Sequence, residues 1–181
     1  MGLRTVLTYE DYAALPADGR RYEIHDGELS VTPAPGTQHQ EVKANLFDVL
    51  RHHVKEHRLG KLFDAPIDCI LTQTAIVQPD IVFVDTERLP IISERGIEGV
   101  PTLVVEVLSP STAHLDRGAK AQLYARHAVP FYWIVDPRSR TIDAYMLVEG
   151  AYQLAARLEG SEARVLPPLA DLVLDPATIW V

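Results

Sequence analysis

The sequence of 181 residues has a single cysteine, Cys69, which lies within an apolar stretch. One cysteine excludes an intrachain disulfide, so the fold is held by packing, and a reducing compartment fits this usage best. The chain lacks any run of about 18 apolar residues, and its start, MGLRTVLTYEDY, turns acidic before the core of a signal peptide could form. We therefore expect a cytoplasmic protein that has no membrane partner.

Positive charge is also scarce, because 17 Lys and Arg residues stand against 25 Asp and Glu residues and give a net charge of -8. This balance argues against broad, nonspecific affinity for nucleic acid, since phosphate binding depends on neutralisation by Lys and Arg. A local basic groove is still compatible with it. An acidic surplus can also arise where carboxylates gather to hold a cation.

The composition is that of an ordinary globular protein, with 47% hydrophobic and 23% charged residues. The chain contains no internal repeat, low-complexity tract or long linker. Its length is enough to bury a substantial core without disulfides or structural metal, so we expect one domain over residues 1–181.

Hydrophobic periodicity and turn residues predict the order of the elements. In chain order these are a short helix at 7–16 capped by Thr8, a hairpin at 20–33 around Asp26-Gly27, a helix at 36–57 whose end is marked by Gly60, strands at 61–71, 75–85 and 102–109, a helix at 111–128 with its N-cap in 109–112, a strand at 129–136 and antiparallel strands over 141–175. The middle of the chain therefore reads α-β-β-β-α-β. We expect an α/β fold of the mixed-sheet, α+β kind, with an N-terminal β-hairpin and a C-terminal antiparallel meander.

A carboxylate interrupts the most apolar strand of the chain, LVVEVLSPS, where Glu106 is surrounded by Val and Leu. A continuous apolar run of this length is typical of a strand that is buried on both faces. An ionised carboxylate there costs several kcal/mol unless it is paired, protonated or bound to a metal. Glu106 therefore requires a partner.

Asp80, in VQPDIVFVD, is a second carboxylate on a central strand. Alternation places Asp80 on the face of Gln78 and Val82, and Pro79 before it indicates a bulge, a strand start or an edge. If Asp80 and Glu106 lie at neighbouring positions, they cannot both ionise cheaply without a cation. Their oxygen ligands suit Mg²⁺ or Mn²⁺. The alternative is that each carboxylate pairs with an arginine or lysine in a structural network.

Lys120 lies on the helix that follows the Glu106 strand, with Asp116 and Tyr124 four residues to either side. From there its ammonium could reach back over the strand end, stabilise developing negative charge or orient an attacking water. A solvated surface lysine is the competing interpretation.

Several motifs together resemble the Uma2 family of restriction endonuclease-like proteins, a branch of the PD-(D/E)XK nuclease superfamily. They are YEIHDGEL, PAPGTQHQ, QPDIVFV, LVVEVLSPST and DRGAKAQLYARHAVPFYWIVDP, in this order. The resemblance extends from about Thr8 to the C-terminus, and the superfamily core has the order α-β-β-β-α-β. It implies that Asp80 is the aspartate of the PD element and that Glu106 is the acidic residue of the (D/E)XK element. The chain departs from the pattern at Leu108, where lysine is expected, and Lys120 matches the position to which this branch moves it.

The same resemblance adds two candidate residues. Glu23 matches a family glutamate that could complete the metal shell or orient water, and a solvent-facing strand glutamate is the alternative. His39 matches a family histidine at the start of a long helix, where it could contact the scissile phosphate or transfer a proton. A histidine with a structural hydrogen bond is the alternative for that position.

The function implied by the resemblance is hydrolysis of phosphodiester bonds in DNA by an Mg²⁺- or Mn²⁺-dependent endonuclease. Asp80 and Glu106 are the expected metal ligands, and Lys120, Glu23 and His39 complete the expected catalytic set. By analogy with other nucleases of this fold, we expect a homodimer. The alternative is a catalytically silent protein of nuclease fold that binds nucleic acid or has a regulatory role.

Two weaker features lie on the helix at 36–57. His53 and His57 have the i, i+4 spacing of a metal pair, but no third ligand is nearby in sequence, so solvated side chains are favoured. The basic segment RHHVKEHR could contact phosphates. It lacks interleaved aromatic residues, so a solvated face is favoured there too.

Overall fold

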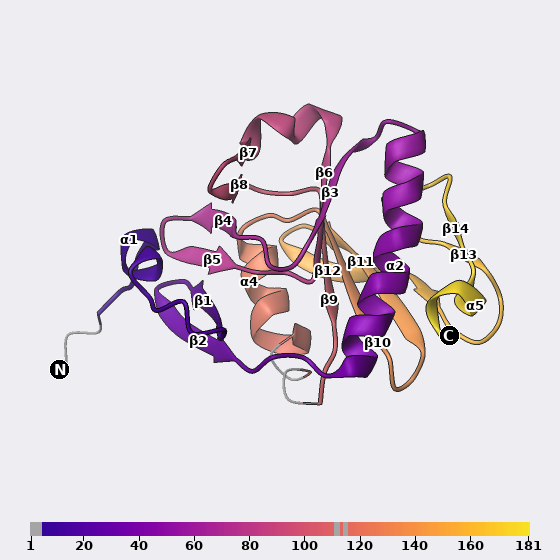
Figure 1. The fold of residues 1–181 in the computed structure, drawn as a ribbon. Coiled ribbons are helices and arrows are strands. Elements are labelled where there is room, and N and C mark those ends of the chain that lie inside the picture. Colours follow the sequence, from indigo (N-terminus) through magenta and orange to yellow (C-terminus); the bar gives the residue numbers. More distant parts are fainter. Residues whose placement is uncertain (1–4, 111–112, 114–115) are drawn as a thin grey trace.

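The computed structural model describes residues 5–110, 113 and 116–181, and Figure 1 shows its elements. Up to residue 85 they are α1 (Tyr9–Ala13), β1 (Arg21–His25), β2 (Glu28–Thr32), α2 (Thr37–Glu56), β3 (Gly60–Asp64), β4 (Cys69–Thr72), β5 (Ala75–Val77) and β6 (Ile81–Asp85). The rest are the 3₁₀ helix η1 (Thr86–Ile91), β7 (Ile92–Ser93), β8 (Gly96–Glu98), β9 (Leu103–Val107), the π-helix η2 (Asp116–Lys120), α4 (Ala121–Arg126), β10 (Phe131–Asp136), β11 (Thr141–Val148), β12 (Ala151–Leu158), β13 (Arg164–Val165), β14 (Val173–Leu174) and α5 (Pro176–Ile179).

The central sheet has the strand order β12-β11-β10-β9-β6-β3. Strands β9 and β10 are parallel, and the other neighbours are antiparallel. Every residue of β9 is buried, as expected for an apolar strand in the middle of a sheet. Elements α2, β3, β6, β9, α4 and β10 give the predicted order α-β-β-β-α-β, so the mixed α+β fold is confirmed.

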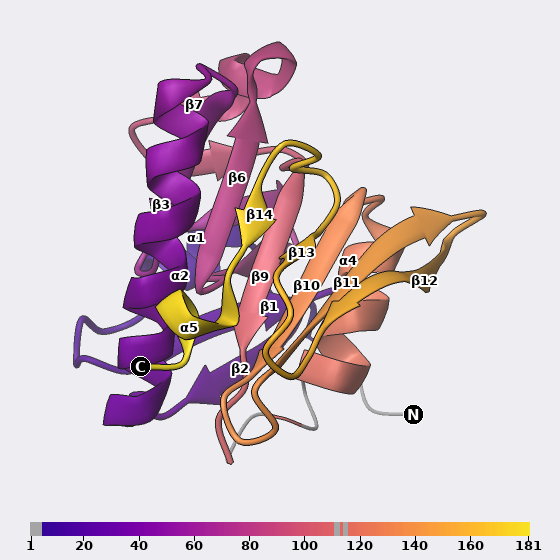
Figure 2. The ribbon, with the colours of Figure 1, turned by 90° about the vertical axis from the view of Figure 1, so that its right-hand side faces the viewer.

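One face of the central sheet is covered by α2 and by the C-terminal segment from β13 to α5, which lies in front of the sheet in Figure 2. Helix α2 buries Val42, Leu46, Leu50 and Val54, which recur at the predicted helical spacing. These side chains pack against the sheet residues that alternate toward this face. This packing fixes α2 against the sheet from Val42 to Val54.

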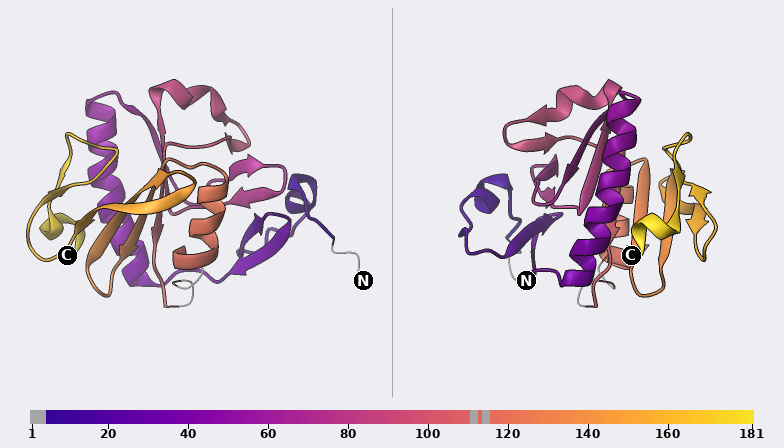
Figure 3. Two further views of the ribbon diagram at one scale, coloured as in Figure 1. Left: turned by 180° about the vertical axis from the view of Figure 1, so that it is seen from behind. Right: turned by 45° about the vertical axis from the view of Figure 1, so that its right-hand side comes forward.

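The opposite face is covered by α4 and by a second sheet of order β2-β1-β5-β4-β8-β7. Cys69 is buried in this layer, as predicted. Figure 3 shows that β1, β2 and α1 form one end of the molecule and that the C-terminal segment lies at the other. The second sheet thus brings the N-terminal hairpin toward the side of the central sheet where Glu106 points.

Two strand predictions need correction. The ranges 61–71 and 75–85 were each expected to form one strand, but each divides between the two sheets, as β3 and β4 and as β5 and β6. Both halves of each range are apolar, so periodicity alone does not reveal the break. Pro66 and Pro79 mark the interruptions, because proline cannot donate to a sheet ladder.

The end of the long helix also differs from the prediction. Helix α2 ends at Glu56, and Arg58 adopts a left-handed φ of 53° while the amide of Leu59 donates to the Val54 carbonyl at 3.0 Å. This is a Schellman arrangement with arginine in the usual glycine position. Gly60, expected to mark the helix end, is instead the first residue of β3.

The other local predictions have mixed outcomes. Thr8 forms a capping box with Asp11, and Asp26 and Gly27 have the positive φ values of a type I′ turn, as predicted. The expected helix at 111–128 is described as η2 followed by α4, and Ser111 and Thr112, which belong to its predicted N-cap range, lie outside the described residues. The C-terminal meander is confirmed for β11 and β12. The short helix α5 was not predicted.

The described part of the chain contains no helix long and apolar enough to cross a membrane.

We predict that Gly60→Ala lowers the free energy of unfolding by about 2–4 kcal/mol. Gly60 has φ 146°, and an added Cβ would lie 2.1 Å from the carbonyl oxygen of Val84 on the paired strand. Gly118→Ala is the matched control, because a Cβ at this helical position meets no atom within 4 Å. Chemical denaturation followed by circular dichroism measures both variants. A Gly60→Ala protein as stable as wild type would contradict this packing.

Candidate functional site

Asp80 lies where the chain passes from one sheet to the other. After β5 the segment 78–80 crosses to the central sheet, and Pro79 in its middle cannot continue the ladder. The register of β6 and β9 pairs Ile81 with Val105. One step further along, this register brings Asp80 opposite Glu106, which is the neighbourhood that the sequence predicted.

The Asp80 carboxylate is held from three directions. Its Oδ1 accepts a hydrogen bond from Nη2 of Arg21 at 3.1 Å, and its Oδ2 lies 3.0 Å from Nε2 of His39 and 2.8 Å from the amide of Val107. Burial alone would raise the pKa of Asp80, but His39, Arg21 and the Val107 amide outweigh it and lower the pKa to about 2. An ionised carboxylate only accepts, so Nε2 of His39 carries the proton of this contact.

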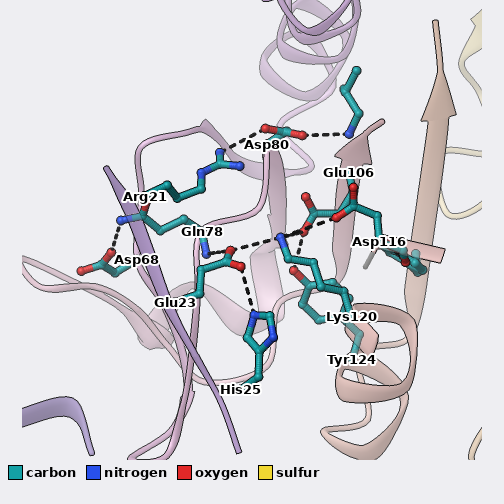
Figure 4. Close-up of polar contacts among 12 residues, drawn as sticks. Arg21, Glu23, His25, Asp68, Gln78, Asp80, Glu106, Asp116, Lys120 and Tyr124 are labelled. Carbon is teal, nitrogen blue, oxygen red and sulfur yellow. Dashed lines mark hydrogen bonds and ion pairs between the residues drawn. The ribbon is translucent and has the colours of Figure 1, made fainter. Parts of the chain in front are cut away.

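Glu106 lies near the end of β9 and points toward α4 (Figure 4). Its Oε1 accepts hydrogen bonds from Nζ of Lys120 at 2.9 Å and from the Tyr124 hydroxyl at 2.6 Å. Burial raises the pKa of Glu106 to about 8, because the attraction of Lys120 is opposed by the neighbouring carboxylates of Asp116 and Asp80. The anionic form of Glu106 is therefore unfavourable unless more positive charge arrives.

Lys120 is buried, with 3% of its surface exposed, so the interpretation as a solvated surface lysine is wrong. It lies at the end of η2, and its Nζ is 3.1 Å from Oε1 of Glu23 and 3.8 Å from Oδ1 of Asp116, in addition to the Glu106 contact. Burial would lower the pKa of Lys120, but Glu106 and Glu23 raise it above its ordinary value. Lys120 is therefore a charged ammonium among carboxylates.

Glu23 is fully buried on β1, so the solvent-facing alternative is wrong for this residue too. Its Oε1 accepts from the amide of Gln78 at 2.8 Å, and its Oε2 lies 3.0 Å from Nε2 of His25. Burial would raise the pKa of Glu23, but Lys120 and His25 lower it to about 2. The carboxylate of Glu23, on the second sheet, therefore lies beside the ammonium of Lys120, on the helical segment that follows β9 (Figure 4).

These buried charges and their partners form one group, the carboxylate cluster. Its members are Arg21, Glu23, Asp80, Glu106, Asp116 and Lys120. Two histidines lie beside these groups, His25 at Glu23 and His39 at Asp80, and each adds positive charge when it is protonated. A divalent cation beside Glu106 would favour its anionic form.

A cavity of about 20 Å³ lies against this cluster and is lined by Asp80, Glu106, Lys120 and His39 among others. That volume holds about one water or one ion. Two buried polar atoms of lining residues, Oγ1 of Thr32 and Nδ1 of His39, have no hydrogen-bond partner among the residues that the structure describes. Buried polar atoms are rarely left unsatisfied, so the surroundings of the cavity favour a polar occupant.

Oxygen donors of this kind fit Mg²⁺ or Mn²⁺, and Asp80 and Glu106 are the residues that would hold such an ion. Within residues 5–110, 113 and 116–181, no group of three or more His, Cys, Asp or Glu side chains is arranged to hold a metal ion. This also leaves His53 and His57 without a third ligand. Mg²⁺ is commonly bound through only one or two carboxylates, with water and substrate phosphate as its other ligands, so two carboxylates are a sufficient donor set.

The sequence missed Arg21 and Thr32. Arg21 stands two residues before Glu23 on the same strand, and alternation puts the two side chains on one face, so a prediction for Glu23 should have included Arg21. Thr32 ends β2 and carries no motif that distinguishes it from other strand threonines. Its place in the site depends on the hairpin's position against the central sheet.

The comparisons with known proteins agree with this fold. The Synechocystis protein named "Uncharacterized protein slr1290" is 29% identical over 150 residues, which cover 77% of this chain and 76% of that protein. A solved structure described as a "putative nuclease belonging to DUF820" from Anabaena variabilis superposes with a TM-score of 0.77 at 20% identity, over 96% of this chain and 97% of that chain. At this identity, the structural likeness shows the fold.

The model of the Uma2 family, described as "Putative restriction endonuclease", matches residues 9–177. This range contains all elements of the central sheet and every member of the carboxylate cluster. The chain therefore belongs to the Uma2 family.

Proposed function

We propose that this protein is a metal-dependent endonuclease that hydrolyses phosphodiester bonds of DNA, with Asp80 and Glu106 as the ligands of Mg²⁺ or Mn²⁺. The observation that carries the proposal is the position of two buried carboxylates, Asp80 and Glu106, opposite each other at the ends of paired strands and beside a cavity with room for about one ion. Asp80 is among the charges that raise the pKa of Glu106, so a divalent cation between the two carboxylates would favour the anionic form of both.

The side chains around the two ligands have distinct roles in this proposal. Arg21, His39 and the Val107 amide hold Asp80 ionised and fix its orientation. Lys120 holds Glu106 and lies where it could stabilise negative charge on the phosphate or orient water. When bound, the divalent ion would supply Lewis acidity toward the scissile phosphate and lower the pKa of the attacking water.

Two further residues act on these groups. Glu23 contacts Lys120 and keeps its ammonium in the site. Nδ1 of His39 has no partner within the described chain, so it could accept a proton and, once it carries that proton, donate a hydrogen bond to a phosphate. Proton transfer and phosphate contact by His39 would each require substrate to reach the cavity beside Asp80 and Glu106.

A protein of nuclease fold that binds nucleic acid without turnover is the second candidate. The observation that favours it is that each proposed ligand already pairs with a cation, Asp80 with Arg21 and Glu106 with Lys120. In that case the ion pairs would take the place of the metal. Metal binding and cleavage separate the two candidates.

We predict that the wild-type protein binds Mn²⁺ in isothermal titration calorimetry and that Asp80→Asn and Glu106→Gln each weaken this binding at least about 10-fold, since each removes an anionic oxygen ligand. Asp143→Asn is the matched control. Asp143 is also a buried carboxylate, but it pairs with Arg157 on the neighbouring strand, away from the cluster. Equal Mn²⁺ binding by all four folded proteins would rule out the proposed ligands.

We predict that wild-type protein with Mn²⁺ converts supercoiled plasmid to nicked or linear DNA and that Glu106→Gln reduces the rate at least about 100-fold. Gel electrophoresis measures the rate, and near-ultraviolet circular dichroism checks that the variant is folded. Asp143→Asn again serves as the control. Plasmid binding without any cleavage by the wild type would favour the second candidate.

We also propose that the acting unit is a homodimer, because the described part of each chain has one such site and cutting both strands of a duplex is most simply done by two. Sedimentation velocity of the wild type in the presence of duplex DNA should give two chains per duplex. One chain per duplex at saturation would contradict a dimer.

A further inference from the structure

Most lysine and arginine side chains of the described residues are in ion pairs with carboxylates. Within this part of the chain, the exceptions are Arg51, Lys55, Arg58, Lys61, Arg138, Arg140 and Arg164. The cations of the carboxylate cluster are also in ion pairs, Arg21 with Asp80 and Lys120 with Glu106. Among the described residues, positive charge without a carboxylate partner is therefore found outside the cluster.

Four of these unpaired cations line one cavity of about 480 Å³. The cavity lies between the last turns of α2, the start of β3 and the 3₁₀ helix η1, and the four residues are Arg51, Lys55, Arg58 and Lys61. All four are exposed, and no carboxylate is among the residues that line the cavity. We call this cavity the basic pocket.

The local backbone places the four charges together. Arg51, Lys55 and Arg58 follow one another at i, i+4 and i+7, which puts them on one side of the helix end. The chain then turns at Arg58 and enters β3 through Gly60, whose Cβ-free backbone lies against Val84 and Asp85. This turn brings Lys61 beside the end of α2.

The helix dipole explains only part of this grouping. Cations near a helix C-terminus are favoured by about 0.3–1 kcal/mol, which applies to Lys55 and Arg58 in or just after the last turn. Arg51 lies more than a turn earlier and Lys61 is on a strand, so neither gains much from the dipole. Four like charges around one cavity repel one another, and an anionic ligand would remove the repulsion.

The pocket lies at the other end of α2 from the carboxylate cluster. Helix α2 begins at the cluster with His39 and reaches the pocket at Lys55, a separation of about 24 Å at 1.5 Å per residue. In Figure 1 the two ends of α2 lie at the bottom and the top of the molecule. About seven nucleotides of one DNA strand, at 3.4 Å each, span the same distance.

We propose that the basic pocket binds the phosphodiester backbone of a nucleic acid whose cleaved bond lies at the carboxylate cluster. The inference rests on the proposed nuclease function and adds to it a second contact that fixes the substrate's direction along α2. Backbone phosphates fit because they are anionic and repeat at a distance that reaches both ends of the helix. The contact reads no base, so it would raise affinity equally for any sequence.

Two triple variants with the same change of charge test the proposal. The first, Arg51→Gln, Lys55→Gln and Lys61→Gln together, removes three cations of the pocket. The second, Arg138→Gln, Arg140→Gln and Arg164→Gln, removes three unpaired cations elsewhere and is the control. Fluorescence anisotropy with a labelled 30-base-pair duplex in EDTA measures binding at several salt concentrations.

We expect the pocket triple to weaken duplex binding by about 10-fold or more, and to make the slope of log K against log salt less steep by about 2 to 3, since three phosphate contacts are lost. The control triple should weaken binding by less than about 3-fold. Equal losses in the two triples, or no duplex binding by the wild type, would overturn the proposal. So would a pocket triple that loses binding to phosphatidylserine vesicles while it binds the duplex like wild type.

Hydrolysis of bis(4-nitrophenyl) phosphate with Mn²⁺ separates this proposal from the proposed function. That substrate has a single phosphodiester and cannot span α2, so both triples should hydrolyse it at the wild-type rate. Hydrolysis by the wild type with equal duplex binding by the two triples would reject the pocket and keep the nuclease. Pocket-dependent duplex binding without hydrolysis of either substrate would keep the pocket and reject the nuclease.

Discussion

The ammonium of Lys120 among three carboxylates is the interaction on which the rest of the site depends. It contacts Glu23 from the second sheet, Glu106 from the central sheet and Asp116 from its own helical segment. Removing one partner from a buried charged group costs about 3–5 kcal/mol, because the others are left uncompensated. The two sheets and the helical segment therefore keep their relative positions partly through one cation, and the geometry of the candidate ligands follows from the same contact.

The segment 78–80, which crosses from the second sheet to the central sheet, helps to position these carboxylates. Gln78 donates its amide to Glu23, and its side chain donates to Tyr12 and Asp68. Two residues later, Asp80 is opposite Glu106. The short segment between β5 and β6 therefore holds Glu23 of the second sheet and places Asp80 beside the central sheet. An uninterrupted strand could not do both, because its alternate side chains would all point to one layer.

The sequence predicted those features whose causes are local. The Asp26-Gly27 turn, the helical spacing from Val42 to Val54 and the buried strand around Glu106 depend on neighbouring residues alone, and all three are confirmed. The division of the apolar ranges into two sheets depends on which layer each half packs against, and periodicity does not carry that information. The same limit explains why Thr32 was missed. The pairing of Asp80 with Arg21 joins residues 59 positions apart, so no local pattern could reveal it.

Two buried carboxylates of this chain have different surroundings. Asp143 pairs with a single guanidinium, that of the half-exposed Arg157, through two hydrogen bonds. Glu106, by contrast, is buried beside further carboxylates, and burial together with Asp116 and Asp80 raises its pKa to about 8 despite the attraction of Lys120. Folded proteins depart from local rules chiefly at functional sites. The raised pKa of Glu106 and the cavity beside Asp80 are thus the physical reasons to propose a cation at these two residues, whose positions are fixed by the ion pairs of Arg21 and Lys120.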